Sequence, residues 1–383
     1  MSSRSEDVVL VTGFPSFRAR KLVEQLLADP AVREVHVIVH ARLAAQAARF
    51  LASLGPEDAS RLVVHPGDAA AIDLGLSGAE RRELAGRIHR IHHLAQTTYP
   101  GTPRDLAVAV NVGGFREVLE LARDVASLDA LVVHSSVAVV GDRRGVVLEE
   151  ELACGQGFRS VVEETLAVAE RNARAAMGEV PIVVVRPAHL VGDSVTGEID
   201  RLDGPYLLVW LMLSAPEELP LLLPARGDRP LCLVPVDHVM RVARQLGRDP
   251  RALGRTFHVV DPAPLSARRV FEAVARASGR RGPRGFIPGD VSRYLLRAPG
   301  LPPGVRTPRS LVDMMTTDVR YDDRGARERL DGTGIACPPF ESYVGVLVGF
   351  VRRQLEERRH AGDEAAEEAD RAGGTEEVED ALA

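Results

Sequence analysis

Short apolar runs alternate with helical segments through the first half of the chain, and this alternation limits the possible folds more than any other feature. The runs are VVLVT (8–12), VHVIV (35–39), RLVVH (61–65), IHRIHHL (88–94), ALVVHSS (130–136) and PIVVVR (181–186). Strands that are apolar along most of their length are buried on both faces by the helices that connect them. The pattern therefore predicts an α/β fold with a doubly wound, parallel, Rossmann-like sheet.

The pattern changes beyond residue 190, where the loops become longer and richer in proline. A predicted strand near 231–236 and another near 256–260 return to the sheet. The predicted domains are a nucleotide-binding core over 6–200 with a return segment over about 231–262, a smaller C-terminal substrate lobe over 201–230 and 263–352, and a tail over 353–383.

The end of the chain is strongly acidic. Residues 361–383 carry nine acidic residues and one arginine, a net charge of −8, whereas the whole chain carries −6. Because this tail has little apolar bulk to bury, we expect it to be disordered and available to contact a partner. The rest of the chain, at about +2, has no concentrated basic face, so we expect no nucleic-acid partner.

Composition predicts a cytoplasmic protein. The longest apolar run, over 207–215, is too short to span a bilayer, and no secretory signal follows the polar N-terminus. Three widely spaced cysteines suit a reducing compartment and suggest no disulfide framework. We also expect no metal site, because His92 and His93 point to opposite faces of one predicted strand and His89 lies too far along it.

The first predicted strand is followed by TGFPSFRA, which has the spacing of a glycine-rich phosphate loop with two glycines replaced. Gly13 permits the tight turn, and Ala19 is small enough for close helix packing. Ser16, however, carries a Cβ where the backbone would approach a pyrophosphate, and Pro15 lacks an N–H donor. Two interpretations remain open: an ordinary strand-to-helix turn, or a phosphate site supported by the helix N-terminus and Arg18.

Polar or small residues also stand near the ends of the other predicted strands, where ligands bind in parallel sheets. They are Arg42, Asp68, Ala95, Ser136 and Pro187, with Asn111 inside the helix after the fourth strand. Arg42 follows the second strand, where an arginine meets a ribose 2′-phosphate, and this favours NADP over NAD.

These positions, together with GDSVTGEIDRLDGPY over 192–206, resemble the extended short-chain dehydrogenase/reductase family over residues 8–352. The branch they resemble contains the thioester reductases and fatty acyl-CoA reductases. The resemblance implies an NAD or NADP cofactor, a carbonyl or acyl-thioester substrate, and a homodimer formed through helices near 103–126 and 156–177. It also implies that Asp68 contacts adenine and that Ser136 polarises the substrate carbonyl.

The tyrosine and lysine of the family's YxxxK motif are missing. The only lysine is Lys21, so no tyrosine anywhere in the chain has a lysine four residues later. Depending on the register, the pair is replaced by Gln156 and Ser160, or by Phe158 and Val162. Neither register supplies the phenol and ammonium that would transfer a proton.

Tyr99 and His189, which follow the fourth and sixth predicted strands, are candidate substitutes for the missing pair. Three functions therefore stay open. The first is a non-catalytic or altered homologue that binds NAD(P) or an acyl ligand. The second is an active oxidoreductase with reassigned residues. The third is a structural or partner-binding subunit.

Overall fold

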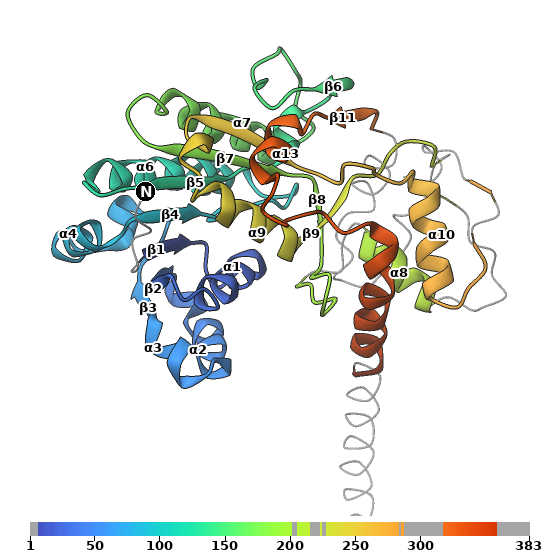
Figure 1. Ribbon diagram of the computed structural model, residues 1–383, viewed down its shortest axis with the longest axis horizontal. Coiled ribbons are helices and arrows are strands. Elements are labelled where there is room, and N and C mark those ends of the chain that lie inside the picture. The colour runs from blue at the N-terminus through green and yellow to red at the C-terminus, as the bar shows by residue number, and fades with distance from the viewer. Residues whose placement is uncertain are drawn as a thin grey trace, which may run out of the picture. The chain divides into compact units, whose positions relative to one another are not determined.

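The computed structural model describes residues 7–200, 205–214, 223, 227–282, 285–286 and 317–357. These residues form two compact units (Figure 1). The first comprises residues 7–191, 229–264 and 317–339, and the second comprises the described residues of 192–228, 265–316 and 340–357. The acidic end of the chain, over 361–383, lies outside the described residues.

The first unit is built on a parallel sheet of seven strands, which confirms the predicted doubly wound Rossmann-like fold. Its strand order is β10-β7-β5-β4-β1-β2-β3, so consecutive strands are added outwards from β1 in both directions. The strands are β1 (Asp7–Thr12), β2 (Val32–Val39), β3 (Leu62–Pro66), β4 (Arg90–His93), β5 (Ala130–His134), β7 (Ile182–Pro187) and β10 (Arg255–Val259). β1, β4, β5 and β7 are buried along their whole length, as their apolar sequences predict.

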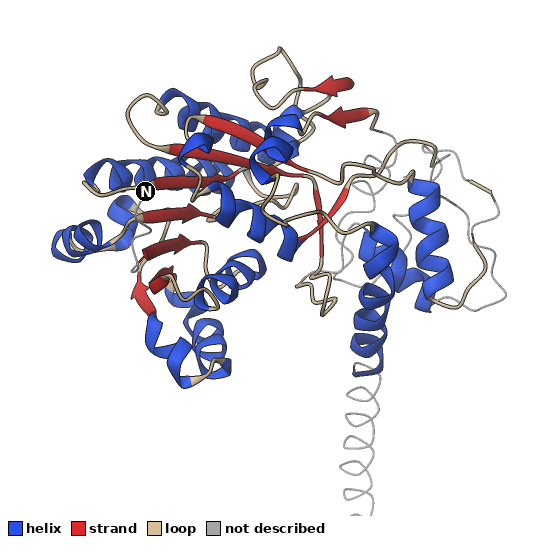
Figure 2. Cartoon of the chain, viewed as in Figure 1, coloured by secondary structure: helices blue, strands red, loops and turns tan. Residues whose placement is uncertain are grey.

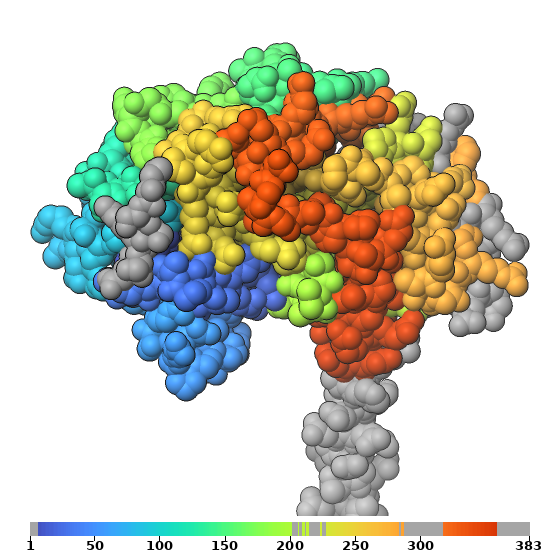
Figure 3. Space-filling model, in the orientation of Figure 1, coloured from blue at the N-terminus to red at the C-terminus, as the bar shows by residue number. Residues whose placement is uncertain are grey.

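Helices cover both faces of this sheet (Figure 2). One face packs on α4 (Gly78–Arg87), α6 (Gly114–Asp124) and α7 (Val161–Ala175), whose apolar sides join the strands in one core. The other face carries α1 (Phe17–Leu27) and α9 (Val236–Leu246), which contact each other although they are far apart in sequence. Gln25 on α1 donates to the carbonyl of Asp237 on α9, and the two segments are neighbours in Figure 3.

Shorter elements complete the first unit. They are η1 (Ala41–Leu43), α2 (Ala44–Ser53), α3 (Pro56–Arg61), η2 (Ile72–Gly75), α5 (Arg104–Ala107), the π-helical turn η3 (Val108–Gly113), η4 (Val137–Val140), η5 (Pro250–Ala252) and α13 (Arg324–Leu330). The helix predicted near 103–126 is thus continuous in space but contains a π-helical turn, where Asn111 lies.

Two small parallel pairs lie outside the main sheet. β8 (His189–Val191) pairs with β9 (Leu233–Pro235), so the strand predicted near 231–236 does not rejoin the main sheet as β10 does. β6 (Gly145–Val147) pairs with β11 (Val319–Tyr321).

The pairing of β6 with β11 explains why residues 317–339, assigned from the sequence to the smaller lobe, belong to the first unit. The buried carboxylate of Glu149 strengthens this attachment, because it accepts hydrogen bonds from the backbone N–H groups of His258, Gly325 and Ala326.

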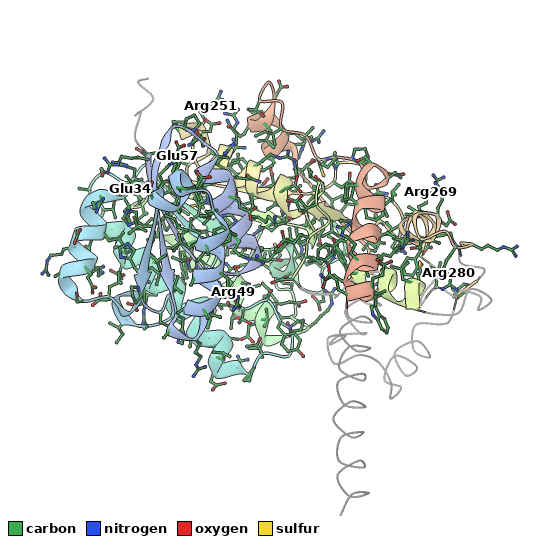
Figure 4. The ribbon with its side chains drawn as sticks, turned by 90° about the horizontal axis from the view of Figure 1, so that it is seen from below. Glu34, Arg49, Glu57, Arg251, Arg269 and Arg280 are labelled. Atoms are coloured by element: carbon green, nitrogen blue, oxygen red, sulfur yellow. The ribbon has the colours of Figure 1, made fainter. Side chains whose placement is uncertain are left out.

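The second unit contains α8 (Pro205–Ser214), α10 (Ala267–Ala277) and a helix over residues 340–357. Residues 353–357, predicted as the start of the tail, therefore continue this last helix. The N-terminal part of the unit is the loop 192–198, in which Gly192 N–H donates to the hydroxyl of Tyr206. Figure 4 labels Arg269 on α10 and Arg280 just beyond it. None of the described helices is long and apolar enough to cross a membrane.

Candidate functional site

The β1–α1 turn, residues 13–16, has a backbone that only glycine suits at its first position. Gly13 has a φ of +82°, and a Cβ added there would lie 2.6 Å from the carbonyl carbon of Leu94 and 2.7 Å from the nitrogen of Ala95. The turn therefore lies directly against the end of β4. Both the left-handed conformation and this close approach explain why this one glycine is present.

Ser16 ends the turn and precedes the first residue of α1. Its side chain is exposed and makes no capping hydrogen bond, while its backbone N–H donates to the carbonyl of Gly13 at 3.0 Å. The Cβ of Ser16 therefore meets solvent rather than protein. Ala19, one turn further along α1, is fully buried. An anion at this helix end would meet the N–H groups of the first helical turn.

A hydrogen-bonded pair joins β1 to β4 beneath this turn. The hydroxyl of Thr12 accepts from Ala95 N–H at 3.3 Å and lies 2.9 Å from Nδ1 of His93. Either atom of this pair can be the donor, depending on the imidazole tautomer. Burial lowers the pKa of His93 to about 4, with the Arg18 charge adding to the effect, so the imidazole is neutral at physiological pH.

The ends of β2 and β3 bring the predicted nucleotide residues Arg42 and Asp68 near each other. Nε2 of His40 lies 3.9 Å from Oδ2 of Asp68, and Nδ1 of His40 accepts from Arg42 N–H at 3.1 Å. Asp68 is half-exposed and Arg42 is exposed. Both side chains are thus accessible at the carboxyl edge of the sheet, as a dinucleotide site requires.

Asn111 organises the loop that follows β4. It is completely buried, and its amide accepts from Thr97 N–H at 2.9 Å and donates to Thr97 O at 3.2 Å and to the Thr165 hydroxyl at 3.0 Å. It thereby joins the π-helical turn to this loop and to α7. The hydrogen bonds describe a positioning role for Asn111.

Ser136 follows β5 at the carboxyl edge. Its half-exposed side chain accepts from the backbone N–H of Ala138 at 3.1 Å and so caps η4. This bond uses an oxygen lone pair, which leaves the hydroxyl hydrogen available to donate. Ser136 is therefore able to donate a hydrogen bond to a carbonyl oxygen.

The α7 start, residues 156–162, differs from the sequence expectation of a helix beginning near 156. The helix begins at Val161, with Ser160 as N-cap accepting from Glu163 N–H at 3.2 Å. Gln156 and Phe158 therefore precede the helix, and neither replaced pair lies on one helical face. The cap at Ser160 and the glycines at 155 and 157 explain the later start.

Gln156 stands in the first register at the position of the tyrosine. Its side-chain amide donates to the carbonyls of Val139 and Leu152, at 3.0 and 2.5 Å, and accepts from Cys154 N–H at 2.9 Å. Both amide hydrogens are thus engaged with the backbone. Gln156 thereby links η4 to the loop over residues 152–154 through side-chain hydrogen bonds.

Val162 stands in the second register at the position of the lysine. It is 3% exposed and belongs to an apolar cluster with Ala107, Val139 and Leu166, against which Phe158 also packs. An ammonium at this position would have to be desolvated among aliphatic side chains. The α7 start is therefore filled by packing and backbone-binding groups.

A buried ion pair behind these positions escaped prediction from the sequence. Glu170 on α7 and Arg186 on β7 are both fully buried, with Nη2 of Arg186 2.6 Å from Oε1 of Glu170. Glu170 also accepts from the hydroxyl of Ser135 at 2.6 Å and from Nε of Arg174 at 2.9 Å. Burial alone would raise the pKa of Glu170, but these cations and hydrogen bonds hold it below its usual range. Two features of the sequence could have predicted this pair: a glutamate on the apolar face of a predicted helix, and an arginine at the end of an apolar strand.

The two predicted substitutes, Tyr99 and His189, lie in different segments of the chain. Tyr99 is half-buried in the loop after β4, and its carbonyl accepts from Thr102. His189 is exposed on β8, two residues after Pro187 at the end of β7. No group of three or more potential metal ligands occurs among the residues that the structure describes.

A family model of NAD-binding domains, described as male sterility protein, matches residues 11–243. The chain belongs to this family. It is an extended short-chain dehydrogenase/reductase of the thioester-reductase branch, as its motifs suggested. The matched residues include β2, β3, β4, β5 and β7 in full and the last two residues of β1, and they end before β10.

Relatives of this family member include reductases of much greater length. Fatty acyl-CoA reductase wat of Drosophila melanogaster is 22% identical over 239 residues, which cover 51% of this chain and 46% of that protein. Glycine betaine reductase ATRR of Emericella nidulans is 27% identical over 289 residues, or 69% of this chain and 22% of that protein. The chain thus spans less than half the length of each.

Solved structures share the fold of this family member. The terminal R domain from the myxalamid PKS-NRPS biosynthetic pathway superposes with a TM-score of 0.76 at 24% identity, covering 91% of both chains. UDP-glucuronic acid 4-epimerase from Bacillus cereus, in complex with NAD, gives a TM-score of 0.66 at 18% identity and covers 91% of this chain and 99% of that one.

A nicotinamide cofactor is characteristic of this family, and the residues at the carboxyl edge fit one. Gly13 keeps the turn narrow, the exposed Ser16 leaves the end of α1 open to solvent, and Asp68 is accessible. Among them, Gly13 and the N-terminus of α1 would hold phosphate, and Asp68 would accept from adenine.

Proposed function

We propose that the chain binds a nicotinamide adenine dinucleotide or an acyl ligand but does not perform the proton transfer of its family. The observation that carries the proposal is the α7 start. There Gln156 donates both amide hydrogens to backbone carbonyls, and Val162 is buried in an apolar cluster. Neither side chain releases or accepts a proton at neutral pH.

The retained geometry of the β1–α1 turn supports binding. Gly13 has the left-handed φ of a phosphate loop, and α1 begins directly after the exposed Ser16. Pro15 has no N–H, and the N–H of Ser16 is bonded to Gly13. Any phosphate held here would depend on the first turn of α1 and on nearby arginines, which reduces the affinity that we expect.

Calorimetric titration of the full chain with NADH and with NADPH tests this proposal, with quenching of the only tryptophan, Trp210, as a check. We expect micromolar or weaker binding and no oxidation of the cofactor when an acyl-CoA or a long-chain aldehyde is added. Turnover of either substrate would contradict the proposal, and so would the absence of binding for the two nucleotides and for acyl-CoA.

We further propose that NADP is preferred over NAD, because the exposed Arg42 follows β2 and its N–H is held by His40. Arg42→Glu should weaken NADPH at least tenfold and leave NADH nearly unchanged, since only NADPH carries the 2′-phosphate. The matched control is Arg171→Glu, which makes the same charge change at an exposed position near the C-terminal end of α7. Equal losses for both nucleotides would refute the preference.

A second candidate function is reduction of a carbonyl or acyl thioester by reassigned residues. Ser136 favours it, because its hydroxyl is half-exposed at the end of β5 and keeps its hydrogen for an acceptor. If the full chain shows turnover, Ser136→Ala should abolish most of it. A comparable loss of turnover in Tyr99→Phe would identify the Tyr99 hydroxyl as the proton donor. The same variants distinguish this function from simple ligand binding, which neither should abolish.

A further inference from the structure

Helix α10 and the residues that follow it concentrate positive charge on the second unit. Residues 268–281 contain five arginines and one glutamate, a net charge of +4, whereas the whole chain carries −6. The apolar residues of α10, among them Val270 and Phe271, are buried, while Arg269 and Arg276 are exposed. The positive charge therefore lies on the side of the helix that faces solvent.

Three of these arginines form what we call the basic face of α10: Arg268, Arg269 and Arg276. Because successive residues are rotated by about 100° around a helix, the three lie within about 100° of one another. None of them forms an ion pair with a residue that the structure describes, and Glu272 on the same side of the helix pairs with none of them. The basic face is therefore not neutralised by the described part of the second unit.

Exposed arginines elsewhere in the protein do reach an acidic residue. The side chain of Arg324 is 73% exposed, yet its Nε lies 2.9 Å from Oδ1 of Asp322. That of Arg327 is 62% exposed, with Nε 3.0 Å from Oδ1 of Asp323. Exposure alone therefore does not explain why the basic face is unpaired.

The stability of α10 does not explain the basic face either. Arg268 and Arg269 lie in the first turn, where the positive end of the helix dipole disfavours cations, and no acidic residue stands in that turn. Arg280, by contrast, has a structural role, because its Nη1 donates to the carbonyl of Met212 in α8 at 2.5 Å. The side chains of the basic face make no such bond to the described residues. They suit an anionic partner from outside those residues.

The acidic end of the chain has the charge to be that partner. Residues 361–383 carry nine acidic residues and one arginine, a net charge of −8. In sequence they follow the helix over 340–357, which belongs to the same unit as α10 and lies next to it in Figures 3 and 4. At about 3.3 Å per extended residue, the chain beyond 357 is long enough to reach α10. Because it is tethered, several individually weak ion pairs are enough to hold it.

We propose that the acidic segment over 361–383 binds the basic face of α10 in the same molecule. The contact is electrostatic, so it weakens as the salt concentration rises. In the isolated protein the segment occupies the basic face, and an acidic partner would have to displace it. The proposal does not depend on nucleotide binding, so its failure would leave the proposed function untouched.

Digestion of the full chain with a glutamate-specific protease tests the proposal, because the acidic segment contains six glutamates. At about 0.02 M salt, cleavage within 361–383 should be about tenfold faster than in the parent protein when the basic face is removed by Arg268→Ser, Arg269→Ser and Arg276→Ser. The matched control removes three exposed helical arginines of the first unit that also lack ion pairs with the described residues: Arg49→Ser, Arg82→Ser and Arg171→Ser. The control should be cleaved at the parental rate, and at about 0.5 M salt all three proteins should be cleaved alike.

Lysine at the three positions of the basic face should preserve most of the protection, because the charge is retained, and melting temperatures show that each variant is folded. A fluorescent peptide of 361–383 gives a second measurement. It should bind about tenfold more tightly to a full chain whose nine acidic residues in that segment are replaced by their amides than to the parent protein, where the face is already occupied. Equal cleavage of the basic-face variant and the control would overturn the proposal. So would protection that rises with protein concentration, which would assign the segment to a second copy of the chain.

Discussion

The β1–α1 turn and the α7 start both depart from the family's pattern, yet the fold accommodates the two departures in opposite ways. At the turn, Gly13 keeps its close contact with Ala95 and the replaced residue, Ser16, points to solvent. At the α7 start, Gln156 is bonded to the loop backbone and Val162 is buried. The turn leaves the N-terminal end of α1 accessible, whereas the α7 start is occupied by an amide bonded to the backbone and by a buried valine.

The two regions also differ in how they bury polar groups. Beneath the β1–α1 turn, His93 is neutral and bonded to Thr12, whereas α7 is held by the charged pair of Glu170 and Arg186. Burial lowers the pKa of a neutral imidazole, and a cationic partner lowers the pKa of a carboxylate, so each group takes up a proton only at lower pH than in the unfolded chain. The comparison therefore predicts different responses to mutation and to pH.

The largest effect is expected from breaking the buried pair. Glu170→Ala should lower the free energy of unfolding by about 3–5 kcal/mol, because it leaves the buried charge of Arg186 without its partner. The matched control is Glu164→Ala on the same helix, where the solvent-exposed pair with Arg104 contributes little because water screens it. Urea denaturation of both variants measures the difference, and similar losses would show that α7 is not held by this pair.

Restoring the family's residues should destabilise the α7 start without creating activity. Phe158→Tyr with Val162→Lys places an ammonium among buried aliphatic side chains, at a cost of about 3 kcal/mol. Gln156→Tyr with Ser160→Lys removes the hydrogen bonds of the Gln156 amide and the N-cap of α7, which should lower the free energy of unfolding by about 1–2 kcal/mol. Thermal melting and an NADPH-oxidation assay with acyl-CoA test both pairs. Substantial reductase activity in either would show that only these two residues had been missing.

Acid should loosen the β1–α1 turn before it affects α7. Burial lowers the pKa of His93 to about 4 and of His92 to about 3, so the unfolded chain binds protons from about pH 6.5 downwards while the folded chain does not. Each such histidine reduces stability by up to about 1.4 kcal/mol per pH unit between these values. The lowered pKa of Glu170 has the same sign but acts at lower pH, because its contribution is present above about pH 4.5 and is lost only as the pH falls below that value.

Urea denaturation at pH 7.5 and 5.5 measures this slope. His93→Gln should reduce it, and the matched control is His40→Gln, which removes a half-exposed imidazole at the same edge of the sheet. An unchanged slope in His93→Gln would mean that the imidazole is not buried in the neutral form.

Substitution of Gly13 should lower the free energy of unfolding for two reasons: its positive φ, and the backbone atoms that lie close to it. Gly13→Ala should cost about 2 kcal/mol, because its Cβ meets the backbone of Leu94 and Ala95 in addition to the left-handed strain. Gly145→Ala is the matched control, since Gly145 has the same φ of +82° and nothing within 4 Å of the added Cβ. Equal melting temperatures for the two variants would show that the approach to β4 is unimportant.

The smallest effect on stability is expected at Ser16. Ser16→Gly should change the free energy of unfolding by less than about 0.5 kcal/mol, because the side chain is exposed and makes no capping bond. It should nevertheless strengthen NADPH binding, since the Cβ is removed from the side where phosphate would approach. Calorimetry checks this, and an affinity that stays unchanged would show that Ser16 does not obstruct the turn.

The doubly wound sheet, the residues at its carboxyl edge and the absence of a YxxxK motif can all be recognised from the sequence alone. These follow from local information: strands that are apolar throughout, helices between them, and a chain with one lysine. The same information assigned Gly13 and Ala19 to positions where small residues are needed, and the structure places both in close contact with their neighbours.

The contacts of the replaced residues could not be predicted from the sequence, because they join segments that are far apart in the chain. The roles of Gln156 and Val162 depend on η4 and on Ala107, which are distant in sequence, and the pairing of Glu170 with Arg186 depends on α7 lying over β7. The attachment of residues 317–339 to the first unit likewise depends on β6 and Glu149. Hydrogen bonds and burial between separate segments depend on how those segments pack. The hydrophobic periodicity of one segment cannot predict them.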